Sequence, residues 1–208
     1  MKCLYCDNEI KKETLATLFI QEDYLCIDCR NKLKVNRKNI KLNGLNIETL
    51  YNYDEGIFKD VLIQYKECFD EALALTFLYL LEDYIRFKYH GYGILFVPSS
   101  KEKMDLRGFN HLELIFQNIK LKRVTGIKMK DSLIQEGKNY DERKKMIDNY
   151  IYDGKKIKKV LIVDDVLTTG SSILGVYKAI KPYVVDVKGL VLSRKENAFI
   201  LNNKCDKI

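Results

Sequence analysis

One stretch of the sequence, residues 160–172, constrains the fold more than any other. Its letters, VLIVDDVLTTGSS, place four apolar residues before two acids and a glycine-centred turn. Consecutive apolar residues are typical of a strand buried on both faces, here residues 159–163. Residues 172–181 then predict a helix ended by Pro182, and residues 184–192 predict a second strand. A strand, a helix and a strand in this order form a βαβ unit, so we expect an α/β protein with a parallel sheet.

The turn between this strand and helix has the chemistry of a site for phosphate and ribose. Ligands of open α/β sheets bind at the carboxyl ends of strands. Backbone amides at a helix start can hold a phosphate, and hydroxyls add donors. Ionised carboxylates accept hydrogen bonds from a ribose diol, directly or through Mg²⁺. We expect the ribose to be held by Asp164 and Asp165, and the phosphate by Thr168, Thr169, Gly170, Ser171 and Ser172.

Two other interpretations of this loop stay open. Acidic pairs after an apolar strand also occur in receiver-like domains, where the acids hold Mg²⁺, but those domains lack the TTGSS sequence that opens the helix here. A plain strand-turn-helix with serine caps would explain Ser171 and Ser172. It would explain neither the adjacent acids nor the two threonines.

The other strong motif is a pair of C-x-x-C sequences, Cys3 with Cys6 and Cys26 with Cys29. Two residues between the cysteines let a turn aim both thiolates at one ion, and two such pairs complete a tetrahedral zinc site. Disulfides are the alternative, but a reducing cytosol disfavours them and each would close a very short loop. Four thiolates leave zinc no open position, so we expect a structural metal.

Other single residues carry weaker expectations. Cys68 and Cys205 stand alone in the sequence and are expected to be small apolar fillers. His90 and His111 show no partner spacing, so we expect them to be structural or exposed.

The rest of the chain supplies further elements. An alternating run covers residues 47–53, and a polar, basic linker is expected at 30–43. Apolar spacing predicts a helix at 70–88 with Leu73, Phe77, Leu80 and Leu81 on one face. Further helices are expected at 56–67 and 110–120, and a buried strand at 93–98.

Charge and hydropathy limit the partners and the compartment. Lysine and arginine number 36 against 29 acids, a net charge of +7. This favours polyanionic partners, although a solvated lysine-rich surface fits equally well. The longest nearly apolar run, residues 72–81, is shorter than the ~20 residues of a membrane span. The N-terminus lacks a signal-peptide pattern, so we expect no membrane span and a cytoplasmic location.

The loop at 160–172 matches throughout the signature of the type I phosphoribosyltransferases. The chain as a whole resembles the ComF family of competence proteins, its ComFC branch most. The resemblance rests on the C-x-x-C pairs, IQYK at 63–66, RGFN at 107–110, the stretch 135–143 and the loop. It implies a type I phosphoribosyltransferase-like parallel sheet flanked by helices at 44–208, behind a zinc-binding module and linker at 1–43.

The resemblance also implies a site for 5-phosphoribosyl 1-diphosphate with Mg²⁺. Ser99, Ser100 and Lys101 would lie on the pyrophosphate side, although an ordinary turn with a surface lysine looks the same. Arg107 would pair with a diphosphate oxygen, with Asn110 capping the next helix. Arg143 lies where the family's mobile segment would close over the site, or is a surface arginine.

Two positions depart from related sequences. His111 stands where the family usually has glutamine. Thr168 occupies the position of an acid in purine-salvage relatives, and a hydroxyl is a poor general base, so ordinary purine chemistry is not expected. The candidate catalytic residues are Asp164, Asp165 and Thr168.

Two functions follow as expectations. In the first, the chain transfers a phosphoribosyl group to an unknown acceptor while pyrophosphate leaves ribose C1. In the second, it is a non-catalytic adaptor that binds single-stranded DNA or a competence helicase during natural transformation.

Overall fold

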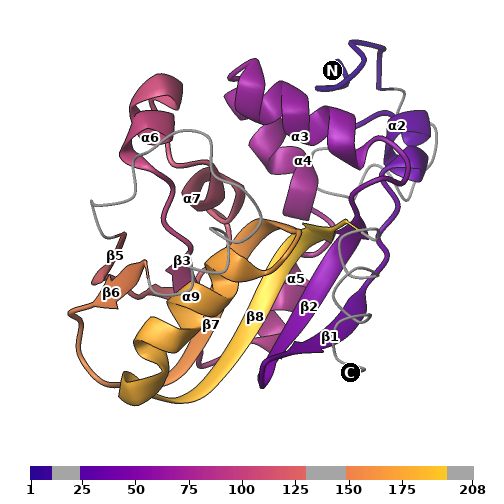
Figure 1. Ribbon diagram of the computed structural model, residues 1–208. Helices are drawn as coiled ribbons and strands as arrows, with labels where there is room; N and C mark the ends of the chain where they lie inside the picture. Colours follow the sequence, from indigo (N-terminus) through magenta and orange to yellow (C-terminus); the bar gives the residue numbers. More distant parts are fainter. Residues whose placement is uncertain (11–23, 130–148, 196–208) are drawn as a thin grey trace, which may run out of the picture.

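The computed structural model describes residues 1–10, 24–129 and 149–195, and its centre is a six-stranded sheet (Figure 1). The strand order is β1-β2-β8-β7-β3-β4, in which β1 runs antiparallel to β2 and the other neighbours pair in parallel. The strands are β1 (Lys38–Leu42), β2 (Leu45–Asn52), β3 (Gly93–Phe96), β4 (Lys122–Arg123), β7 (Ile157–Leu167) and β8 (Val184–Arg194). A separate antiparallel pair joins β5 (Ile127–Met129) to β6 (Tyr150–Tyr152).

Helices cover both faces of this sheet. Side chains alternate along a strand, so neighbours in β7 enter different cores. Leu161 and Val163 pack with the helices before β3, while Val160 and Ile162 pack with α9, which crosses the front of β7 and β8 in Figure 1. The helices are α2 (Ile27–Lys32), α3 (Phe58–Glu67), α4 (Ala74–Leu78), α5 (Glu82–Lys88), α6 (Lys101–Arg107), α7 (His111–Ile115) and α9 (Ser171–Ile180), with 3₁₀ turns at Glu71–Leu73 and Lys181–Tyr183. The predicted α/β class, with a mostly parallel sheet flanked by helices, is confirmed.

Three predicted elements differ in extent. The helix expected at 70–88 is divided into a 3₁₀ turn, α4 and α5, and the turn between α4 and α5 leaves Leu80 55% exposed rather than on the apolar face. The helix expected at 110–120 ends with α7 at Ile115. The strand expected to stop at residue 163 continues to Leu167, because its pairing with β8 runs on to Arg194.

The predicted linker at 30–43 contains a strand. Lys38–Leu42 forms β1, which turns into β2 through Asn43 and Gly44, with φ values of 46° and 86°. Two successive residues at positive φ are typical of the tight turns that join hairpin strands. An edge strand needs few apolar side chains, and here only Ile40 and Leu42 join a core, so its sequence looked like a linker.

The N-terminal cysteines share the core of the main sheet. Cys3, Cys26 and Cys29 are buried in the same apolar cluster as Leu50 of β2 and Phe58 of α3. The division at residue 43 therefore stays a proposal about organisation. Across the described residues, no helix combines the length and apolar content needed to cross a membrane.

Candidate functional site

The two acids of the predicted loop lie at the carboxyl edge of the sheet. Because β3 and β7 are parallel neighbours, they end at the same edge, where Asp164 and Asp165 in β7 face the loop that follows β3. Gly170 then caps α9 with φ 75°. The acids and the expected phosphate turn are therefore contiguous, as the parallel βαβ order requires.

Asp165 is held by two side chains from distant parts of the sequence. Lys66, in the last turn of α3, forms an ion pair with its Oδ2 atom, and His111 Nε2 lies 2.8 Å from the same atom. Burial alone would raise the pKa of Asp165, but the hydrogen bond from His111 and the charge of Lys66 outweigh it and hold the pKa below its usual range. Asp165 is therefore an ionised acceptor at neutral pH.

Asp164 differs from its neighbour in protonation. Burial, followed by the negative charge of Asp165, raises the pKa of Asp164. Its Oδ1 atom accepts a hydrogen bond of 2.9 Å from the Asp165 amide. A cation or a ribose diol beside this carboxyl would favour its ionised form, so ligand binding and proton release are coupled here.

His111, like Lys66, is a site residue whose role the sequence did not reveal. It is 4% exposed, and burial lowers the pKa of its imidazole, although the bond to Asp165 opposes this effect. Arg107 Nη1 lies 3.5 Å from its Nδ1 atom, and a guanidinium can only donate. Nδ1 is therefore the acceptor, and the proton on Nε2 is donated to Asp165. His111, which stands where the family usually has glutamine, thus links Arg107 to Asp165.

Ser99 and Arg107 reach the acids through His111. Ser99 Oγ lies 3.4 Å from His111 Nδ1. Arg107 also donates from Nε to the Lys66 carbonyl at 3.2 Å and lies 3.7 Å from Glu67, with its side chain only 8% exposed. In this structure its guanidinium anchors α6 to the end of α3.

The loop after β3 begins α6 as a capped helix. Ser100 is the N-cap and accepts a 3.4 Å hydrogen bond from the Lys103 amide. Lys101 starts α6, but its side chain lies outside the described part of the chain, as does Arg143. Asn110 caps α7 by accepting from the Glu113 amide at 3.3 Å, as the sequence predicted.

Two hydroxyl groups lie within hydrogen-bond distance of each other at the turn into α9. Thr169 Oγ1 lies 2.8 Å from Ser171 Oγ, Thr168 is exposed, and Ser172 is partly exposed in the first helical turn. Gly170 has a packing reason as well, since a Cβ atom there would lie 2.4 Å from Leu42 Cδ2. A side chain at this position would therefore press on the Leu42 side chain of β1, which would have to shift.

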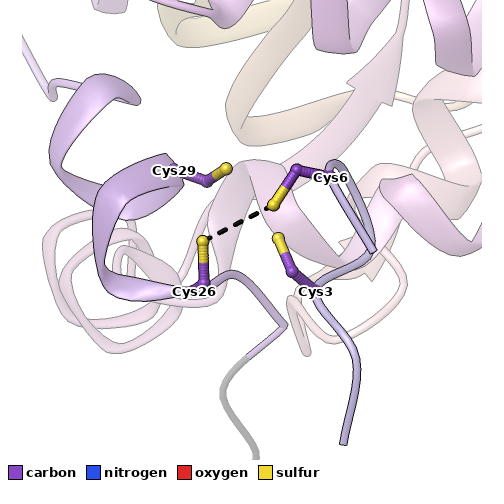
Figure 2. Close-up of side chains that lie close together, drawn as sticks. All are labelled: Cys3, Cys6, Cys26 and Cys29. Atoms are coloured by element: carbon purple, nitrogen blue, oxygen red, sulfur yellow. Dashed lines mark hydrogen bonds between the residues drawn. The ribbon is translucent and has the colours of Figure 1, made fainter. Parts of the chain in front are cut away.

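The four cysteines converge on one point, as Figure 2 shows. Their sulfur atoms all lie within 4.8 Å of one another, with Cys6 and Cys26 Sγ at 3.6 Å. Zinc–sulfur bonds of about 2.3 Å in a tetrahedron place sulfurs about 3.8 Å apart, so the cluster fits a metal such as zinc. The two C-x-x-C pairs are brought together as predicted, and no disulfide joins them.

Three residues without a partner motif remain: Cys68, Cys205 and His90. Cys68 is exposed, so its prediction as a small apolar filler was wrong; it is the C-cap residue of α3. Cys205 lies outside the described residues. His90 is exposed, one of the two situations expected.

Comparisons with known proteins found the following similarities. The chain is similar to the competence protein ComFC of Streptococcus pneumoniae (strain ATCC BAA-255 / R6), with 26% identity over 222 residues that cover 93% of this chain and all of that protein. A solved hypoxanthine phosphoribosyltransferase from Staphylococcus aureus is similar with a TM-score of 0.39 and 18% identity, over 62% of this chain and 66% of that one, just under two thirds of its length. No family model matches the chain. The resemblance to the ComF family that the sequence motifs indicated is thus confirmed along nearly the whole chain.

Proposed function

We propose that the carboxyl edge of the sheet binds 5-phosphoribosyl 1-diphosphate with Mg²⁺. The observation that carries this proposal is the ionised Asp165 beside Asp164, directly before a positive-φ glycine and the start of α9. The acids would hold the ribose diol or Mg²⁺, and the turn of Thr168, Thr169, Gly170, Ser171 and Ser172 would hold the 5-phosphate. The pyrophosphate side would meet Ser99, Ser100, Lys101 and Arg107.

The reaction that such a site supports is phosphoribosyl transfer. The bond from ribose C1 to the diphosphate oxygen breaks, a bond from the acceptor nucleophile to C1 forms, and pyrophosphate leaves. Mg²⁺ would neutralise the departing diphosphate. Asp164, Asp165 and Thr168 are the candidate catalytic residues, and the acceptor is of a kind that needs no carboxylate base at position 168.

Calorimetric titration with phosphoribosyl diphosphate and MgCl₂ tests the site. Asp165→Asn keeps the shape of the side chain but removes its charge, so we expect affinity to fall at least about tenfold. Asp83→Asn, on an acid whose side chain is 96% exposed on α5, is the matched control and should bind as the parent does. Equal affinity in the parent, Asp165→Asn and Asp83→Asn would show that the ligand does not bind at Asp165.

We further propose that the cysteine cluster holds structural zinc. The four thiolates fill its coordination shell, which leaves no position for substrate. Reduced thiols suit a reducing compartment, in keeping with a cytoplasmic location.

A second candidate function is a non-catalytic adaptor in DNA uptake that contacts single-stranded DNA or a competence helicase. It is favoured by the name of the relative, a competence protein matched over its whole length, and by the +7 charge. Measured release of pyrophosphate separates the two. Release that requires an added acceptor supports the enzyme, whereas binding without release under all acceptors supports the adaptor.

A further inference from the structure

A broad groove lies at the opposite edge of the sheet from the phosphoribosyl site. It has a volume of about 910 Å³ and is lined where β3, β4 and β7 begin, by residues that include Gly93, Lys122 and Lys159. Asp164 follows Lys159 by five residues in an extended strand, so the two sites are about 17 Å apart. The groove is therefore separate from the acids and their ligand.

The wall of this groove is strongly basic. Its eight Lys and Arg residues, all exposed, are Arg86, Lys120, Lys122, Arg123, Lys155, Lys156, Lys158 and Lys159. Asp153 is the one acid among the lining residues, and Lys128 pairs with it at 2.7 Å. The groove thus presents a concentrated positive field to solvent.

Most of these cations have no acidic partner among the residues that the structure describes. Arg86 pairs with Asp83 at 3.5 Å and Arg123 with Glu113 at 2.5 Å. Within the described ranges, the six lysines of the lining form no ion pair. Like charges held close together repel one another, and an anionic ligand would relieve that repulsion.

The groove also has aromatic side chains beside it. A smaller hollow of about 310 Å³ shares Lys156 and Lys158 with it and is lined by Tyr183, which is 38% exposed and whose ring meets Tyr152 at 5.2 Å. On α5, Phe87 is 89% exposed; it does not line the groove itself, but it follows Arg86 in the sequence and precedes His90 by three residues, and both of these line it. Exposed rings beside a row of cations are the arrangement that binds unpaired bases and their phosphates.

We propose that this groove binds single-stranded nucleic acid, with the lysines on the phosphates and Phe87 and Tyr183 on the bases. The inference gives a location to the nucleic-acid contact of the adaptor proposed above, and it does not depend on the phosphoribosyl site. A single strand fits better than a duplex, because its bases are free to stack on side chains.

The test compares two triple variants by fluorescence anisotropy with labelled oligothymidylate over a range of salt. The groove triple is Lys155→Glu, Lys156→Glu and Lys158→Glu, and the control triple is Lys34→Glu, Lys41→Glu and Lys59→Glu. All six lysines are exposed, and each triple lowers the net charge from +7 to +1. The control therefore removes as much charge from other surfaces.

We expect the parent to bind with an affinity that falls with salt, and the groove triple to bind at least about tenfold more weakly. Each phosphate contact contributes about −0.7 to the slope of log K against log salt, so losing three should make it shallower by about 2. The control triple should keep most of the parent's slope. Phe87→Ala should weaken the binding that persists at high salt, whereas Phe69→Ala, on a ring near the opposite edge, should not.

Three outcomes would overturn the proposal: no oligonucleotide binding by the parent at low salt, equal losses in both triples, or a duplex bound as tightly as the single strand. Titration of the groove triple with phosphoribosyl diphosphate and MgCl₂ keeps the two sites distinguishable. Unchanged affinity there, with oligonucleotide binding lost, supports a separate groove whether or not the first site proves to be catalytic.

Discussion

At the scale of single residues, the candidate site is organised around the Asp165 carboxylate. Lys66 reaches it from α3 and His111 from α7, and their side chains are 19% and 5% exposed. Removing a partner from such a nearly buried pair leaves the other charge without compensation, which is costly. These contacts therefore fix the position of the acid before any ligand arrives, and a ligand cation has to share Asp165 with Lys66.

Replacing His111 tests whether its role is to hold Asp165. Glutamine also offers a donor and an acceptor, so His111→Gln should keep both contacts and change the free energy of unfolding by less than about 1 kcal/mol. His111→Leu leaves the carboxylate and Arg107 without that partner and should cost about 1–3 kcal/mol. Urea unfolding of the two variants measures the difference, and equal losses would show that packing alone matters at this position.

A second buried carboxylate, Glu48 in β2, stabilises the fold two strands away from β7. Glu48, 4% exposed, accepts hydrogen bonds from Tyr84 at 2.6 Å and Tyr89 at 2.8 Å, and pairs with Lys88 at 2.9 Å. Burial alone would raise the pKa of Glu48, but these bonds outweigh it and lower the pKa. The ionised form is therefore the one that the folded state favours.

A group with a lowered pKa stabilises the fold above its unfolded pKa, about 4.3 for glutamate, and this contribution is lost as the pH falls through the folded pKa. Glu48→Gln should thus be less stable than the parent by about 1–3 kcal/mol at pH 7. The difference should shrink below about pH 4. Urea unfolding across this range checks it, and a difference that does not vary with pH would contradict the charged role.

Sequence reasoning found the residues that are close in the chain and missed those that are not. Asp164, Asp165 and the turn after them are contiguous in the sequence, and the C-x-x-C spacing of the cysteines predicts a metal site. His111 and Lys66 lie 54 and 99 residues from Asp165. Lys66 ends the IQYK motif and His111 directly follows the RGFN motif, but only the folded sheet shows that they meet at one carboxylate.

At the scale of elements, burial on both faces made the central strands predictable. Four consecutive apolar residues in β7 could only be a buried strand or a short buried helix, and the flanking turn favoured the strand. The edge strand β1 lacks this signal because one of its sides meets water. The split between α4 and α5 was missed for a different reason, since one apolar period runs across a turn that only tertiary packing reveals.

The contact between the start of α9 and β1 can be tested with two glycines. Gly44 and Gly170 both have positive φ, of 86° and 75°, but a Cβ atom would lie 3.9 Å from its nearest neighbour at Gly44 and 2.4 Å at Gly170. Gly44→Ala should cost about 1–2 kcal/mol from backbone strain alone. Gly170→Ala should cost about 1–3 kcal/mol more, from overpacking against Leu42.

Urea unfolding of both variants, each also made with Leu42→Ala, separates the two effects. The smaller side chain should recover part of the extra loss in Gly170→Ala and none of the loss in Gly44→Ala. Absence of any recovery would mean that strain, and not the contact with β1, sets the cost. Because Gly170 faces Leu42, a loss of ligand affinity in Gly170 variants would not by itself locate the phosphate.

At the scale of the whole molecule, the cysteine module and the sheet are joined by a common core. Leu25 and Leu33, which flank the second cysteine pair, are buried with Leu50 and Tyr51 of β2. The Tyr51 hydroxyl donates to the Phe77 carbonyl at 2.7 Å, so the same cluster extends to α4. Because the cysteine module and the sheet share one core, the sheet stabilises the module, and loss of structure in the module destabilises the sheet.

Removing the metal should therefore destabilise more than the N-terminal module. We expect protein purified without chelator to contain about one equivalent of zinc. Cys29→Ser should lose most of it and lower the Tm by at least about 5 °C, since about 1 kcal/mol shifts the Tm of a chain of this size by about 2–4 °C. Cys68→Ser, an exposed cysteine outside the cluster, is the matched control and should change neither zinc content nor Tm.

Calorimetry of Cys29→Ser should show one transition, because a shared core unfolds as a unit. Two transitions, with the later one at the Tm of the parent, would instead establish residues 1–43 as an independent domain whose metal supports only itself.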